Sequence, residues 1–162
     1  MGANLIIYCL EQVTDYMEFE RLCHDIMSLA GYKLIEPLGG FKDKGRDAIH
    51  FSTNDGVTIF AYSVREDWRA KLAEDSNKIH SHKHACNSLV FITTAAMTAG
   101  ERDEAIGYIK DTYGWHLEIY NLERLRNLLE IQYPDIKFKY PQIFPPDFLA
   151  ITEQTSSQRE HI

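Results

Sequence analysis

The residues best suited to chemistry lie in a glycine-rich turn, GGFKDKGRDAIHF at residues 39–51, which holds two acids and three basic side chains. Asp47 is the last residue before the alternating segment Ala-Ile-His-Phe, so we expect it at the start of a strand. A carboxylate on a rigid strand can hold a divalent cation, because hard cations prefer oxygen ligands. The same composition is also typical of an ordinary charged hairpin, since Gly and Asp are common turn residues.

The turn belongs to a regular succession of expected elements. Helical spacing of apolar residues and helix start and stop signals predict helices at residues 15–30, 65–80, 100–114 and 122–130. Alternating or continuous apolar runs predict strands at residues 32–37, 47–52, 57–63, 87–94 and 116–121. The order is therefore helix, three strands, helix, strand, helix, strand, helix. It indicates an α/β fold with a central mixed sheet and helices on both faces.

Length and composition favour one globular domain. The chain has 162 residues, of which 44% are hydrophobic and 25% charged. We expect the domain to span residues 1–140, followed by an extended, linker-like tail at 141–162 that is rich in Pro and polar residues. No apolar run approaches the roughly 18 residues that cross a bilayer. Three scattered cysteines and the absence of a basic N-terminal flank predict a cytoplasmic protein with buried thiols and no membrane partner.

The charge distribution argues against a general nucleic-acid coat but allows a local binding surface. The formal net charge is −7, whereas neutralising phosphates requires clustered Lys and Arg. The basic residues do cluster in the middle of the sequence, and those expected to contact nucleic acid are Lys42, Lys44, Arg46, Arg69 and Lys78. The average charge therefore conceals an expected basic rim.

Three segments resemble, in order, the Mrr-like restriction endonuclease branch of the PD-(D/E)XK nuclease superfamily. FERLCHDIMSLAGYKLIE resembles the opening helix of that branch, and DKGRDAIHF resembles its Asp-x-Gly-x-Asp motif at the start of a strand. VTIFAYS occupies the position of the third motif, and FITTAAM and YGWHLEIYNLERLRNLL resemble the last strands and the closing helix. The resemblance covers roughly residues 15–132.

The resemblance implies a restriction-endonuclease-like three-layer α/β/α fold and Mg²⁺-dependent hydrolysis of DNA, with Mn²⁺ as a substitute metal. It places Glu20 and Asp47 as metal ligands and the backbone carbonyl of Ala61 as a third. It further implies an effector domain of a restriction or anti-phage defence protein. Such a domain precedes a sensor or NTPase region in a longer protein, and it cuts two strands as a homodimer.

The sequence departs from the family at the third motif, where Glu or Gln, one residue and then Lys are expected. Here the triplet is Ala61, Tyr62 and Ser63, which lacks both functional side chains. In some members the lysine has moved to the neighbouring helix, so Lys71 or Arg65 is expected to replace it as a catalytic residue. The alternative is a catalytically inactive domain that serves nucleic-acid binding or oligomerisation.

Other features have competing structural explanations. Lys71 has the helical spacing to pair with Asp67 or Asp75 as an ordinary surface ion pair. Trp68 is interpreted as core packing rather than a platform for bases. The series His80, His82, His84 and Cys86 could bind zinc, but structural zinc usually draws pairs from two segments. A polar loop before the next strand is the better interpretation of that series.

Overall fold

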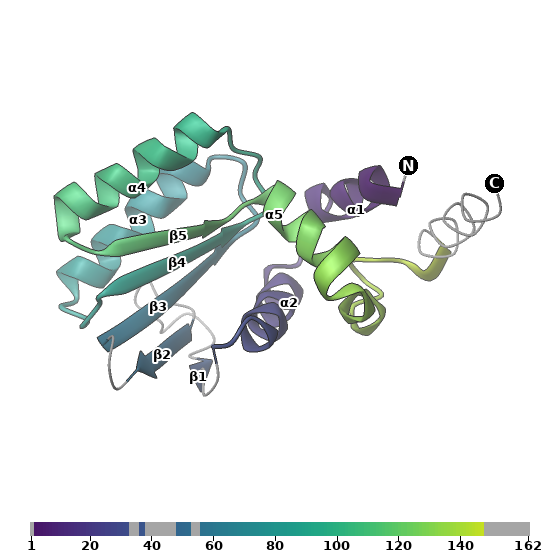
Figure 1. Ribbon diagram of the computed structural model, residues 1–162, viewed down its shortest axis with the longest axis horizontal. Coiled ribbons are helices and arrows are strands. Elements are labelled where there is room, and N and C mark those ends of the chain that lie inside the picture. Colours follow the sequence, from purple (N-terminus) through teal and green to yellow (C-terminus); the bar gives the residue numbers. More distant parts are fainter. Residues whose placement is uncertain (1, 33–35, 38–47, 53–55, 148–162) are drawn as a thin grey trace.

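The computed structural model describes residues 2–32, 36–37, 48–52 and 56–147, which form a five-stranded sheet with helices packed against it (Figure 1). The first half contains α1 (Gly2–Glu11), α2 (Tyr16–Leu29), β1 (Glu36–Pro37), β2 (Ala48–Ser52), β3 (Gly56–Ser63) and α3 (Trp68–Ser81). The second half contains β4 (Ser88–Thr93), α4 (Ala99–Tyr113), β5 (His116–Tyr120) and α5 (Leu122–Asn127). A π-helical turn, Leu128–Gln132, and a 3₁₀ helix, Pro134–Lys139, follow α5.

The sheet is mixed, as the sequence predicts, and β3 is the strand at which its two halves meet. The strands lie in chain order, β1-β2-β3-β4-β5; the β1–β2 and β2–β3 pairs are antiparallel, and β3–β4 and β4–β5 are parallel. Ala48, the first residue of β2, lies opposite Phe60, while Ser63 at the end of β3 lies opposite Thr93. The start of β2 and the ends of β3 and β4 therefore lie at the same end of the sheet. This end, marked by Ala48, Ser63 and Thr93, is called the sheet edge below.

Both faces of the sheet are covered, and alternate residues of β3 pack on each. Phe60 and Tyr62 belong to the core cluster formed with α1, α2 and α5, whereas Ile59 and Ala61 belong to the cluster formed with α3 and α4. Figure 1 shows α3 and α4 on one side of the sheet and α1, α2 and α5 on the other. Burial on both faces explains why β3 and β4 are nearly continuous apolar runs.

Side-chain caps define several helix ends. The Asp15 carboxylate accepts a hydrogen bond from the Glu18 N–H (3.1 Å) at the start of α2. Thr98 and Glu101 form a reciprocal capping box at the start of α4. Gly114 ends that helix in the left-handed conformation, at φ 77°. These signals are local, which is why the sequence predicts both helices within two residues of their observed bounds.

The structure adds one helix that the sequence analysis did not predict. The expected order began at the helix of residues 15–30, but α1 precedes it and buries Ile6, Cys9 and Leu10 in the core. The last helix is also shorter than expected, because α5 ends at Asn127 and the chain continues as a π-helical turn. The expected element order is therefore corrected by one additional N-terminal helix.

Packing continues beyond residue 140, where the expected domain ends. Ile143 and Phe144 are buried in the same cluster as α1 and α2. The expected tail from residue 148 onward lies outside the described residues, so its extended character stays a prediction. Cys9, Cys23 and Cys86 are all described, and none forms a disulfide. Within the described ranges, no helix combines the length and apolar character needed to cross a membrane.

Gly107 inside α4 and Gly114 directly after it provide a matched test of backbone conformation. We expect Gly114→Ala to lower the free energy of unfolding by about 1 kcal/mol, because φ 77° strains an L-residue although no atom lies within 4 Å of the added Cβ. Gly107→Ala, inside the same helix with equally open space, should raise it by about 0.5–1 kcal/mol. Urea denaturation of both variants measures this, and effects of the same sign would contradict the assigned conformations.

Candidate active site

The expected metal-binding aspartate, Asp47, lies outside the described residues, as do Lys42, Lys44 and Arg46. Its chain neighbour Ala48 is described, and the β2–β3 register places Ala48 opposite Phe60. Phe60 immediately precedes the triplet Ala61, Tyr62 and Ser63. The third-motif position and the first described residue after Asp47 are thus adjacent in the sheet.

The triplet itself offers no charged side chain at this edge. Ala61 is fully buried and faces the α3 and α4 side of the sheet, while Tyr62 is fully buried on the other side. The Ser63 hydroxyl accepts a hydrogen bond from the Arg65 N–H at 3.1 Å, which holds the turn that leaves the strand. The departure from the family motif is therefore also a structural one, because β3 supplies packing where an acid and a lysine are expected.

Glu20 and Lys71 are carried by helices on opposite faces of the sheet. Glu20 is half-buried in α2, next to Phe19, whose side chain is buried in the α1, α2 and α5 cluster. Lys71 lies in the first half of α3, between Trp68 and Leu72 of the opposite cluster. The two side chains can serve one site only at the sheet edge where β3 ends, since the strands separate them elsewhere.

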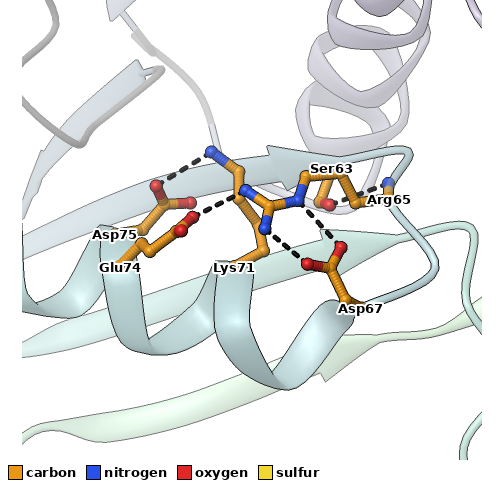
Figure 2. A network of polar contacts seen from close by, with 6 residues as sticks. All are labelled: Ser63, Arg65, Asp67, Lys71, Glu74 and Asp75. Carbon is orange, nitrogen blue, oxygen red and sulfur yellow. Dashed lines mark hydrogen bonds and ion pairs between the residues drawn. The ribbon is translucent and has the colours of Figure 1, made fainter.

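Arg65, one of the two candidates for the missing lysine, is held by two carboxylates (Figure 2). Its Nε and Nη2 donate to Asp67 at 2.9 and 2.6 Å, and its Nη1 donates to Glu74 at 2.6 Å. The hydrogen bonds that Arg65 donates to Asp67 and then to Glu74 raise the pKa of Arg65, and the contact with Arg65 lowers the pKa of Asp67. All three side chains are substantially exposed, so these ion pairs link the β3–α3 turn to α3 at the protein surface.

Lys71, the other candidate, has a different environment. Its Nζ lies 2.9 Å from Oδ1 of Asp75, and the two side chains are only 19% and 3% exposed. Figure 2 shows Asp75 and Glu74, adjacent in sequence, turning to different cations. The sequence spacing allows Lys71 to pair with Asp67 or Asp75, and the structure assigns Lys71 to Asp75 and Asp67 to Arg65. The four-residue spacing predicts the Lys71–Asp75 pair but not the burial of Asp75.

A cleft of about 270 Å³ opens at the carboxyl ends of β3 and β4. Its lining includes Arg65 and Glu66 from the β3–α3 turn, Thr94 just after β4, and Glu11 at the end of α1. Ligands of open α/β sheets commonly bind beyond the carboxyl ends of the strands. The cleft lies at the sheet edge where the triplet ends, and it carries both charge signs.

Of the five residues expected to contact nucleic acid, two are described, Arg69 and Lys78. Arg69 reaches towards α4 and pairs with Glu101 at 3.2 Å and Glu104 at 3.7 Å. Lys78 is exposed in the last turn of α3, nine residues further along, which is about 13 Å along the helix axis. The role of Arg69 and Lys78 in nucleic-acid binding stays a prediction. The carboxylates of Glu101 and Glu104 partly neutralise Arg69, which weakens its expected attraction for phosphates.

The histidine series does not form a metal centre in the described structure. His80 packs against Tyr113 with ring centroids 5.3 Å apart, at the end of α3. Burial raises the pKa of Cys86 to about 12, and its thiol donates a hydrogen bond to the Ser88 carbonyl at 3.4 Å. Within the described ranges, no three His, Cys, Asp or Glu residues are grouped so as to hold a metal ion. Trp68 is 7% exposed and belongs to the core, which confirms its interpretation as a packing residue.

Comparison with known proteins identifies the family. A model of the Mrr catalytic domain, described as restriction endonuclease, matches residues 12–129, a span from just after α1 to the π-helical turn that follows α5. Searches of curated proteins and of solved structures found no match. The matched span contains α2, the whole sheet and α3, so it includes every expected catalytic position. The chain belongs to the Mrr-type restriction endonuclease family.

Proposed function

We propose that this protein is a metal-dependent endonuclease that hydrolyses DNA phosphodiester bonds within a restriction-endonuclease-like three-layer fold. The observation that carries the proposal is the family match over residues 12–129, together with a register that sets the start of β2 beside the end of β3. A role as the effector of a restriction or anti-phage defence protein accords with that family. The sensor or NTPase region and the homodimer belong to the same proposal.

The proposed metal site consists of Asp47, Glu20 and the backbone carbonyl of Ala61. Its chemistry fits Mg²⁺, or Mn²⁺ in its place, because all three donors are oxygens. The bound cation would polarise the scissile phosphate and lower the pKa of a coordinated water. Two observations support this location. Ala48, which follows Asp47, pairs with Phe60, the residue before Ala61, and Glu20 is half-buried on α2.

Lys71 is the residue that we assign to the role of the missing lysine. An ammonium close to the sheet, held by a single carboxylate, would stabilise negative charge that develops on the phosphoryl oxygens. Arg65 is less suited, because its Nε, Nη1 and Nη2 donate to Asp67 and Glu74 and its side chain points along the surface. Lys71 has one carboxylate partner and a mostly buried side chain, which fixes its position relative to β3.

A second candidate function is binding or oligomerisation without catalysis. The observation that favours it is the complete burial of Ala61 and Tyr62 with no acidic or basic side chain in the triplet. If it is correct, the protein binds DNA or itself but does not cut DNA with any divalent metal.

The first prediction tests the activity and its metal site. We expect the full chain to nick or linearise supercoiled plasmid with Mg²⁺ or Mn²⁺, and Asp47→Ala to slow cleavage by about 10²-fold or more because it removes a metal ligand. EDTA should abolish cleavage. Asp103→Ala, which removes an exposed carboxylate on α4, serves as the control and should cleave like the unmodified protein. Cleavage that survives Asp47→Ala would overturn the site, and DNA binding without cleavage would support the second function.

The second prediction separates Lys71 from Arg65. Lys71→Ala should reduce cleavage by about 10²–10³-fold, as expected when a group that stabilises transition-state charge is lost. Arg65→Ala should leave cleavage nearly unchanged, because it removes only the exposed ion pairs of Arg65 with Asp67 and Glu74. Time courses on plasmid, with circular dichroism as the folding control, measure both variants. The reverse pattern would move the catalytic role to Arg65.

A further inference from the structure

Asp75 is a carboxylate buried on the face of α3 that packs against the sheet. Its neighbours along this face, Leu72 one turn before and Ile79 one turn after, belong to the same core cluster as Ile59 and Ala61 of β3. The Asp75 side chain is 3% exposed. An ionised acid in such a position loses its hydration, so it requires a compensating partner.

Stability alone does not explain this pair. Desolvation of two charges can exceed their attraction, and replacing a buried ion pair by apolar residues is often neutral or stabilising. Exposed pairs of the same spacing contribute little. A helix face already lined by Leu72 and Ile79 would pack equally well with a third apolar residue.

The pair also solves a geometric problem. A lysine on α3 has a long, flexible side chain, and an ammonium free to sample many rotamers would be poorly placed for catalysis. The Asp75 Oδ1 accepts a hydrogen bond from Lys71 Nζ at 2.9 Å, which selects one arrangement. The adjacent Glu74 points to Arg65 instead, so the two cations do not compete for one carboxylate (Figure 2).

We propose that Asp75 is a positioning residue, whose carboxylate holds the Lys71 ammonium in the orientation needed for phosphodiester cleavage. The inference rests on the proposed nuclease function and extends it to a residue outside the strand motif. The cation that β3 lacks at Ser63 is thereby supplied by Lys71 of α3, and Asp75 of the same helix holds it in place. Asp75 acts through Lys71 and does not itself contact DNA.

The kinetic test compares Asp75→Asn, which keeps the shape but removes the charge, with Asp75→Glu, which keeps the charge. Under single-turnover conditions with saturating protein and Mg²⁺, Asp75→Asn should lower the cleavage rate constant by about 10²-fold while DNA affinity stays unchanged. Asp75→Glu should recover part of the rate. The control is Glu130→Gln, which breaks the Arg126–Glu130 pair of identical spacing and should leave cleavage unaffected. An unchanged rate for Asp75→Asn would overturn the proposal.

A double-mutant cycle distinguishes positioning from an independent structural effect. Lys71→Ala, Asp75→Ala and the double variant are compared by cleavage rate and by thermal unfolding. If Asp75 acts only through Lys71, the double variant is no slower than Lys71→Ala. Rate losses that multiply would show that Asp75 acts elsewhere and would overturn the assignment.

A third measurement does not require activity. The full chain is treated with an amine-reactive ester, and modification of each lysine is followed by peptide mass spectrometry. Asp75→Asn should accelerate modification of Lys71 several-fold because it removes the charged acceptor that holds Nζ, while Lys78, exposed on the same helix, keeps its rate. Equal Lys71 rates in both proteins would overturn the positioning role. A chain that never cleaves DNA would contradict the proposed function, whereas this measurement would still decide whether Asp75 holds Lys71.

Discussion

The pairing of β3 with its two neighbours is the constraint on which the rest of the structure depends. β3 accepts an antiparallel partner on one side and a parallel partner on the other, so it joins the β1–β2 hairpin region to the β4–β5 half. Its start is also fixed, because the Asn87 side chain accepts a hydrogen bond from the Val57 N–H at 2.8 Å and the Asn87 N–H donates to the Val57 carbonyl at 2.9 Å. This two-point contact sets the β3–β4 register. A shift by one residue would exchange the two core faces.

The same register decides where chemistry can occur. With Ala48 opposite Phe60 and Ser63 opposite Thr93, the start of β2 and the ends of β3 and β4 meet at one edge of the sheet. Only at such an edge can side chains from helices on both faces come together, because the sheet separates them along its length. Glu20 on α2 and Lys71 on α3 are carried by helices on opposite faces, so the proposed site requires them to meet there. The site proposed for this protein therefore depends more on register than on any one side chain.

Much of the fold could be predicted because its signals are local. Helix ends are marked within a few residues by the caps at Asp15 and Thr98 and by the terminal Gly114. Strands β3 and β4 are marked by their apolar runs. Helix α1 lacked such a signal, since its apolar residues are nearly continuous and its helical character depends on packing against α5 and the π-helical turn. The family resemblance was confirmed because motif order survives even where one motif has changed.

The candidate site was less predictable for a physical reason. Sequence spacing shows that Lys71 can reach Asp67 or Asp75, but it does not show which acid faces the sheet. That depends on the rotation of α3, which is fixed by Trp68, Leu72 and Ile79 in the core. Once those residues are buried, Asp75 must turn inward, whereas Asp67 precedes the helix and its exposed side chain pairs with Arg65.

The rotation of α3 also bears on whether the domain is a nuclease or a catalytically inactive binding domain. A decayed site loses the need to bury charge, and drift would replace an inward acid with an apolar residue, because burial of an ion pair is energetically unrewarding. Here the triplet Ala61, Tyr62 and Ser63 carries no acid or lysine, while the helix beside the strand holds a buried acid and a cation in direct contact. The charged pair therefore lies on the helix and not on the strand. That asymmetry is the physical ground for preferring the catalytic function over the binding one.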